Sequence, residues 1–162
     1  MFQETQQFRQ KGMYVIYILL IAVIGMFIYA IIQQIFLGRP FGDKPAPDAV
    51  LVIATVLMLA LLISLYRSKL ETKITNEGVS FKWIPFKNSY SLYKWEDIEK
   101  AEIIKYGFVG YGLRLSRYGI IYNIGGNRGL RLVLKSGRKF VLGTQQPEEM
   151  ERYLKSIPNS KL

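Results

Sequence analysis

The stretch MYVIYILLIAVIGMFIYAIIQQIF, residues 13–36, contains no charged side chain over 24 residues. An α-helix rises 1.5 Å per residue, so about 20 such residues cover the roughly 30 Å hydrocarbon core of a bilayer. A second uncharged run, AVLVIATVLMLALLISLY, follows at residues 49–66. Neither run has the polar stripe of a surface helix in a soluble protein, so the sequence predicts two membrane spans.

The connecting segment LGRPFGDKPAPD, residues 37–48, contains three prolines and two glycines and cannot continue a helix. We therefore expect an antiparallel helical hairpin (13–66) with an external turn at 37–48. A cleaved signal peptide is the alternative for the first run, because Arg9 and Lys11 precede it. Its apolar part is too long for a signal peptide, and no small-x-small cleavage site follows it.

Positive charge flanks the outer ends of this hairpin. Arg9 and Lys11 precede the first run, and the juxtamembrane basic residues Arg67, Lys69 and Lys73 follow the second. Because cytoplasmic flanks are enriched in Lys and Arg, we expect a cell-membrane protein (inner or plasma membrane) with both termini cytoplasmic. Residues 1–12 are then expected to be a cytoplasmic tail.

The two runs contain no Asp, Glu, Lys or Arg. Transporters and proton pumps normally carry ionisable groups inside the membrane, and two helices alone cannot enclose a path. The hairpin is therefore interpreted as an anchor.

Composition restricts the chemistry of the whole chain. The sequence has 162 residues with no cysteine and no histidine, and its net charge is +10, of which +9 falls after residue 66. Disulfides, Cys/His zinc sites, thiolate nucleophiles and His-dependent triads are thereby excluded. We expect no cofactor, no metal site and no catalysis.

From Leu70 onward, the long apolar runs are replaced by short segments in which apolar and polar residues alternate. LETKIT and VSFKWI flank the turn NEG at 76–78, which predicts a hairpin with Val79, Phe81 and Trp83 on one face. Further strands are expected in these segments: 89–95, 97–106, 112–117, 120–124, 129–136 and 139–144. We expect about seven strands in a small antiparallel barrel or sandwich.

A helix is predicted after the strands. In QPEEMERYLKSI, Pro147 suits the first helical position, and Met150, Tyr153, Leu154 and Ile157 fall at helical spacing on one face. Pro158 ends the pattern, which leaves residues 158–162 as a tail.

Three segments carry a resemblance to a known family: TKITNEGV at 72–79, WEDIEKAEI at 95–103 and KSGRKFVLGTQQPEEMERYL at 135–154. With the preceding helix pair, they make the sequence resemble bacterial membrane proteins with a pleckstrin-homology-like (PH-like) domain. The resemblance implies an α+β membrane protein with a PH-like domain at 70–157. It carries over no catalytic residue.

The glycines of YGIIYNIGGNRG, residues 118–129, suggest a phosphate-binding loop. Such loops need a helix N-terminus directly after the glycines, whereas the strand-like LRLVLK follows here. GFVGYG, 107–112, fails for the same reason, so both are interpreted as turns.

The motif GLRL occurs at 112–115 and again at 129–132. On a sheet with one buried face, its leucines (Leu113, Leu115, Leu130 and Leu132) would point inward and Arg114 and Arg131 outward. Together with Arg117 and Arg128, these arginines form our candidate site for anionic lipid headgroups or an acidic partner. A solvated basic strand face is the alternative.

Three other features of the sequence bear on partners, activity and location. Five aromatic residues interleave with the arginines, as in proteins that bind single-stranded nucleic acid: Tyr106, Phe108, Tyr111, Tyr118 and Tyr122. A membrane tether argues against a nucleic-acid partner. The carboxylates Glu96, Asp97, Glu99 and Glu102 pair with no nucleophile or metal-ligand pattern. The C-terminal tripeptide Ser160-Lys161-Leu162 matches a peroxisomal targeting signal. Because this signal directs soluble proteins, the two predicted spans argue against it.

The sequence thus predicts a membrane-anchored PH-like binding or scaffolding module that recognises a protein partner or anionic headgroups. An accessory subunit of a larger membrane complex, assembled through the spans, is the alternative. A lipid-processing enzyme is the third reading.

Overall fold

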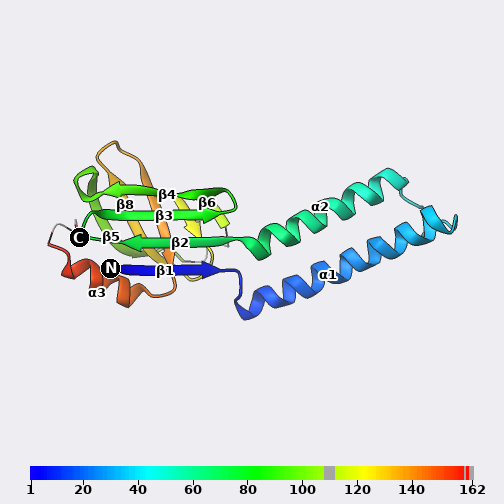
Figure 1. Cartoon of the computed structure of the whole chain (residues 1–162), viewed down its shortest axis with the longest axis horizontal. Coiled ribbons are helices and arrows are strands. Elements are labelled where there is room, and N and C mark those ends of the chain that lie inside the picture. Colours follow the sequence, from blue (N-terminus) through cyan, green and yellow to red (C-terminus); the bar gives the residue numbers. More distant parts are fainter. Residues whose placement is uncertain (108–111, 159, 161–162) are drawn as a thin grey trace. The chain divides into compact units, whose positions relative to one another are not determined.

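The computed structural model describes residues 1–107, 112–158 and 160. It divides into two compact units, a helical hairpin of residues 9–67 and a two-sheet unit made of residues 1–8 and 68–162. Figure 1 shows the helices and strands of both units. Phe108, Tyr111 and the terminal residues Lys161 and Leu162 lie outside the described residues.

The hairpin consists of two long helices, as predicted. Helix α1 (Lys11–Ile31) continues into the π-helical turn η1 (Ile32–Phe36), and α2 spans Asp48–Arg67. Both are long and apolar enough to cross a membrane, and only 11% of the most apolar window of each is buried in the structure. A core helix of a soluble protein would be mostly buried, so this exposure argues against that reading.

The turn between the helices is held by side-chain contacts. The Gln34 amide donates to the Ala46 carbonyl at 2.7 Å and to the Asp48 carboxylate at 2.6 Å. The rings of Tyr29 and Phe41 meet edge to face at 5.9 Å. Gly38 adopts φ +63°, a conformation that ends helices, directly after the last helical turn.

The strands of the two-sheet unit form a four-stranded sheet in the order β1-β2-β3-β4 and a five-stranded sheet in the order β5-β8-β9-β7-β6. Their bounds are β1 Phe2–Gln7, β2 Lys69–Ile74, β3 Gly78–Ile84, β4 Lys87–Lys94, β5 Ile98–Lys105, β6 Gly112–Ser116, β7 Gly119–Asn123, β8 Arg128–Leu134 and β9 Lys139–Thr144. The 3₁₀ turn η2 (Trp95–Asp97) links the sheets. The described residues thus form nine strands rather than about seven.

The expectation of a wholly antiparallel architecture was wrong, and of the two expected alternatives, barrel or sandwich, a closed barrel is not formed by the described residues. The sheets are not wholly antiparallel, because β7 runs parallel to β9. The two sheets also do not close into a barrel within the described residues, since each keeps its own edge strands.

The first strand lies where the sequence predicted a tail. Phe2–Gln7 pairs antiparallel with β2, from Phe2 opposite Ile74 to Gln7 opposite Lys69. Its alternate residues Phe2, Glu4 and Gln6 are buried. The strand was missed because two of its three inward residues are polar, which hides the usual alternation.

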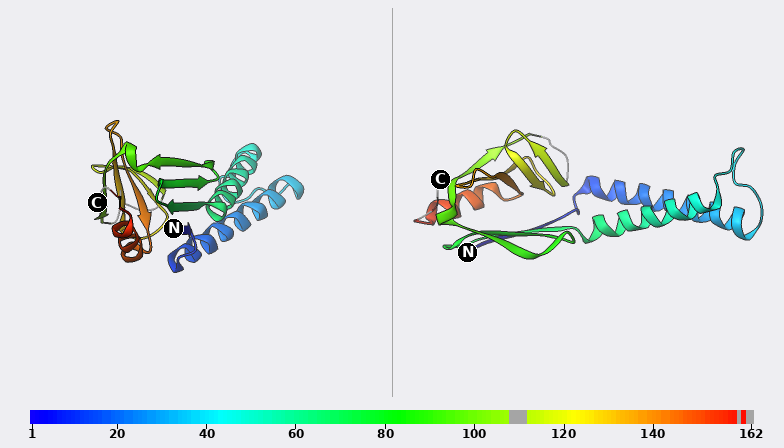
Figure 2. Two further views of the ribbon diagram at one scale, coloured as in Figure 1. Left: turned by 60° about the vertical axis from the view of Figure 1, so that its left-hand side comes forward. Right: turned by 90° about the horizontal axis from the view of Figure 1, so that it is seen from above.

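Aromatic rings of the two sheets pack against one another. Figure 2 shows the two sheets from two further sides. The Phe81 ring of β3 lies 4.9 Å from Tyr122 of β7 and 5.6 Å from Phe140 of β9. Val79, Phe81 and Trp83 are all buried, which confirms the face predicted for β3. Helix α3 (Pro147–Ser156) completes this core with Met150 and Leu154, both fully buried.

Candidate functional site

The predicted arginines do not form one cluster. Arg128 begins β8 and donates to the Glu148 carboxylate at 2.6 Å, which ties this strand to the first turn of α3. Arg131, three residues further along the same strand, lies on the opposite face. Arg128 therefore has a structural contact, and the other three arginines remain as candidates.

Arg114, Arg117 and Arg131 lie on the outer face of the five-stranded sheet, and two of them, Arg117 and Arg131, contact the same tyrosine. The Arg117 guanidinium lies 4.8 Å from the centre of the Tyr118 ring and donates to its hydroxyl at 2.7 Å. The Arg131 guanidinium lies 5.8 Å from the same ring. We call Arg114, Arg117, Tyr118 and Arg131 the Tyr118 surface.

Strand register places Arg114 on this surface. Arg131 lies opposite Val141, Val141 opposite Ile121, and Ile121 opposite Arg114, in one row across four adjacent strands. Neighbouring strands are about 4.8 Å apart, so the two ends of this row are about 14 Å apart. Val141 and Ile121 are fully buried in a small cluster with Tyr106, against which Tyr118 packs. In this row, Arg131 and Arg114 therefore lie on either side of two buried apolar residues, Val141 and Ile121.

One carboxylate partly balances this charge. Glu102 lies opposite Arg131 in the β5–β8 pair and accepts its hydrogen bond at 2.6 Å. The same carboxylate binds Lys100 at 2.7 Å, and Lys100 together with Arg131 holds the pKa of Glu102 below its usual value. Arg114 is exposed and makes no ion pair among the residues that the structure describes. The surface therefore keeps a net positive charge.

The outer face of the other sheet carries a comparable but more nearly neutral cluster. Lys73 and Lys82 lie 4.5 Å and 4.8 Å from the centre of the Tyr90 ring. Glu71 accepts from the Tyr90 hydroxyl at 2.6 Å and pairs with Lys82 at 3.0 Å. Of the predicted juxtamembrane residues, Lys73 joins this cluster, whereas Lys69 starts β2 and Arg67 is the exposed last residue of α2.

The leucines of the first GLRL motif are on the inner face of their sheet, opposite Ile120 and Tyr122, but they are not buried in the core. Leu130 and Leu132 of the second motif are fully buried, whereas Leu113 and Leu115 are 57% and 85% exposed. The reason is their position, because β6 is the edge of its sheet and pairs only with β7.

A buried polar cluster joins β1 to the other sheet. Glu4 accepts from the Thr144 hydroxyl at 2.6 Å and from the Gln145 amide at 2.7 Å, and Gln6 donates to the Gly143 carbonyl at 2.6 Å. Burial raises the pKa of Glu4 despite these bonds. Burial, with the nearby Glu4 charge, raises the pKa of Tyr106 to about 12. These contacts hold β1 in place, and nothing in the sequence of β1 indicated them.

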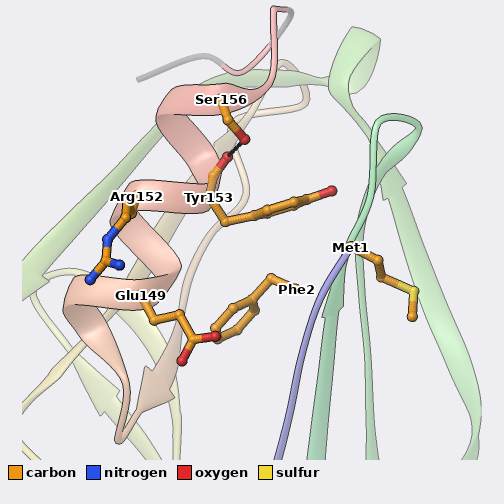
Figure 3. Close-up of a pocket in the computed structure, with 6 residues that line it drawn as sticks. All are labelled: Met1, Phe2, Glu149, Arg152, Tyr153 and Ser156. Atoms are coloured by element: carbon orange, nitrogen blue, oxygen red, sulfur yellow. Dashed lines mark hydrogen bonds between the residues drawn. The ribbon is translucent and has the colours of Figure 1, made fainter.

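An open pocket of about 330 Å³ lies between α3 and the start of β1. Figure 3 shows its lining residues, which are Met1, Phe2, Glu149, Arg152, Tyr153 and Ser156. The side chains of this lining include one carboxylate, Glu149, and one guanidinium, Arg152.

The remaining motifs have structural roles. Residues 118–129 form β7, a short link and the start of β8, so a strand follows the glycines, as predicted. Glu102 is ion-paired, and Glu96 pairs with Lys94 at 3.3 Å. Among the described residues, no group of three or more acidic side chains could hold a metal ion.

Comparison with known proteins returns no relative. No family model matches the chain, and no curated protein or solved structure has significant similarity to it. Its function therefore has to be inferred from the arrangement of its own residues.

Proposed function

We propose that the chain is a membrane-tethered, non-catalytic binding module with a PH-like two-sheet unit. Its helices cross the cell membrane, and the Tyr118 surface binds the phosphate-bearing headgroups of anionic lipids on the cytoplasmic side. The observation that carries the proposal is that three arginines lie on one outer face. Among the residues that the structure describes, Arg131 alone of the three has a carboxylate partner.

The tether is supported by how the sheet unit is assembled. Residues on both sides of the hairpin, Phe2–Gln7 and Lys69–Ile74, pair in one sheet. If the two helices cross a membrane, both flanks must then lie on the same side of it. The pairing also favours retention of α1 over its removal as a signal peptide, because cleavage after α1 would separate β1 from the chain.

The orientation follows from charge. Arg9, Lys11, Arg67 and Lys69 lie at the sheet-unit ends of the helices, whereas the turn carries Arg39 and Lys44 together with Asp43 and Asp48. Lys and Arg concentrate on the cytoplasmic side of membrane proteins. This bias supports a cytoplasmic sheet unit.

The choice of ligand follows from the chemistry of guanidinium groups. Arginine forms charge-assisted, often bidentate hydrogen bonds with phosphate oxygens, and juxtamembrane cations are attracted to anionic leaflets. The Tyr118 surface carries more unbalanced positive charge than the Tyr90 cluster, where Glu71 faces two lysines. A PH-like assignment is supported by the element order, in which strands are followed by one C-terminal helix.

We expect charge reversal on the Tyr118 surface to weaken headgroup binding strongly. The double substitution Arg114→Glu and Arg117→Glu in the full chain, purified in a neutral detergent, should weaken binding of short-chain phosphatidylglycerol at least about tenfold. Isothermal titration measures the affinity. Short-chain phosphatidylcholine and inorganic phosphate serve as the zwitterionic and the free-anion probes.

Arg152→Glu is the control, because it makes one substitution of the same kind, with half the charge change of the double variant, at an exposed residue of α3. It should leave the affinity for phosphatidylglycerol within about twofold of the original value. Equal affinity for phosphatidylcholine, or unchanged binding in the double variant, would refute the headgroup proposal. Competition by inorganic phosphate at equal affinity would reassign the surface to free phosphate.

A further inference from the structure

Several large apolar side chains of the two-sheet unit are exposed to solvent, and three of them are considered together. Phe86, in the β3–β4 turn, is 80% exposed, and Leu113 and Leu115 of β6 are 57% and 85% exposed. We call these three residues the apolar rim. Soluble proteins rarely leave large apolar residues on an edge strand, because such an edge promotes aggregation.

Strand register places Phe86 at the end of the sheet where the chain enters both helices. Ile84, two residues before Phe86, lies opposite Lys69, and Lys69 lies opposite Gln7. Lys69 follows α2 after the single residue Ser68, and Gln7 is the last residue of β1 before α1. Within the sheet unit, Figure 1 shows the β3–β4 turn beside the beginning of β2.

Ring contacts connect this turn to β6. The Trp83 ring lies 6.3 Å from Phe86 and 5.8 Å from Tyr122. Tyr122 is directly opposite Leu113 in the β6–β7 pair, so the two side chains share a face of the sheet. Leu115, two residues along β6, continues the same face.

Cations accompany the apolar rim. Lys87 follows Phe86 directly, and Arg114 stands between the two leucines of β6. Apolar side chains flanked by Lys and Arg are the composition of segments that lie in the headgroup region of a bilayer.

We propose that the apolar rim inserts into the boundary between headgroups and acyl chains of the membrane that anchors the protein. This inference rests on the proposed membrane tether, and it adds a second contact with the bilayer that does not depend on lipid charge. The alternative occupant, a second copy of the chain, is disfavoured because contact through β6 would bring the Arg114 side chains of two copies together.

The sequence permits a direct test, because it contains no cysteine. Single variants Phe86→Cys and Leu115→Cys of the full chain are labelled with an environment-sensitive nitrobenzoxadiazole dye in phosphatidylcholine nanodiscs. We expect blue-shifted emission, protection from aqueous iodide and quenching by lipids with a nitroxide near the headgroup. Asn76→Cys is the control, since Asn76 is exposed in the β2–β3 turn at the opposite end of both strands.

Dye at positions 86 and 115 that is as accessible to iodide as dye at position 76 would overturn the inference. Protection that depends on the number of chains per nanodisc, without quenching by nitroxide lipids, would assign the rim to contact between copies and overturn it as well. The nanodiscs contain no anionic lipid, so loss of phosphatidylglycerol binding in the arginine variant would leave this result unchanged.

Discussion

Deletion of Phe2–Gln7 is expected to unfold the two-sheet unit, although this segment is the one that the sequence suggests is a tail. The deletion removes β1 and its six residue pairs with β2. It also removes Phe2, which is 4% exposed, and truncating a buried phenylalanine alone costs about 3–5 kcal/mol.

The polar contacts of β1 increase this cost. Without Glu4 and Gln6, the Thr144 hydroxyl, the Gln145 amide and the Gly143 carbonyl lose their partners. Each buried polar group left without a hydrogen bond costs about 1–3 kcal/mol. The total approaches the 5–15 kcal/mol by which an ordinary domain is stable, so we expect few folded molecules to remain.

Tryptophan fluorescence during urea denaturation measures this effect. The only two tryptophans, Trp83 and Trp95, are buried in the two-sheet unit, so the signal reports on this unit and not on the helices. The control is Gln3→Ala with Thr5→Ala, which changes the exposed residues of β1 and should shift the midpoint little. A deletion variant with the original midpoint would show that β1 contributes nothing to stability.

The second large effect is expected for Gly119→Ala. Gly119 adopts φ +97°, and a Cβ atom there would lie 2.1 Å from the carbonyl oxygen of Lys139. This oxygen belongs to the backbone of β9, which pairs with β7, so it cannot move away without disturbing the sheet. We expect a loss of about 3 kcal/mol or more in the free energy of unfolding, from strain and overlap together.

Gly137→Ala separates these two causes. Gly137 adopts a similar φ of +81°, but no atom lies within 4 Å of the position that a Cβ would take. Only backbone strain applies there, so we expect a loss of about 1–2 kcal/mol. Equal losses for the two alanines in the same urea titration would contradict the close approach of Gly119 to β9.

Local sequence patterns predicted the helices and strands in which apolar residues recur at regular spacing. The uncharged runs gave both helices, and the alternation of Val79, Phe81 and Trp83 gave the buried face of β3. The helical spacing of Met150 and Leu154 likewise predicted the buried side of α3. In each case one stretch of chain carries the whole signal.

Features that depend on distant partners could not be predicted. Strand β1 buries Glu4 and Gln6, whose partners lie more than 130 residues away, so no local pattern marks them as inward. The exposure of Leu115 follows from the edge position of β6, which only the topology reveals.

The candidate site likewise combines residues that are adjacent in sequence with residues that only the fold brings together. Arg117 and Tyr118 are adjacent in sequence, whereas Arg131 and its partner Glu102 reach this surface through the register of β5, β8 and β9. Arg128 shared the sequence signal of the other arginines but pairs with Glu148 on α3. The sequence therefore predicted which arginines lie near Tyr118 only in part, and the ligand of this surface stays a proposal.

The proposed function requires that the two helices cross a membrane with the sheet unit on the inner side. Single-cysteine variants Asp43→Cys, in the turn between the helices, and Asn76→Cys, in the sheet unit, test this in intact cells that express the full chain. A membrane-impermeant maleimide should label position 43 from outside and label position 76 only after permeabilisation. Labelling of position 76 in intact cells as readily as position 43 would contradict the proposed topology and function.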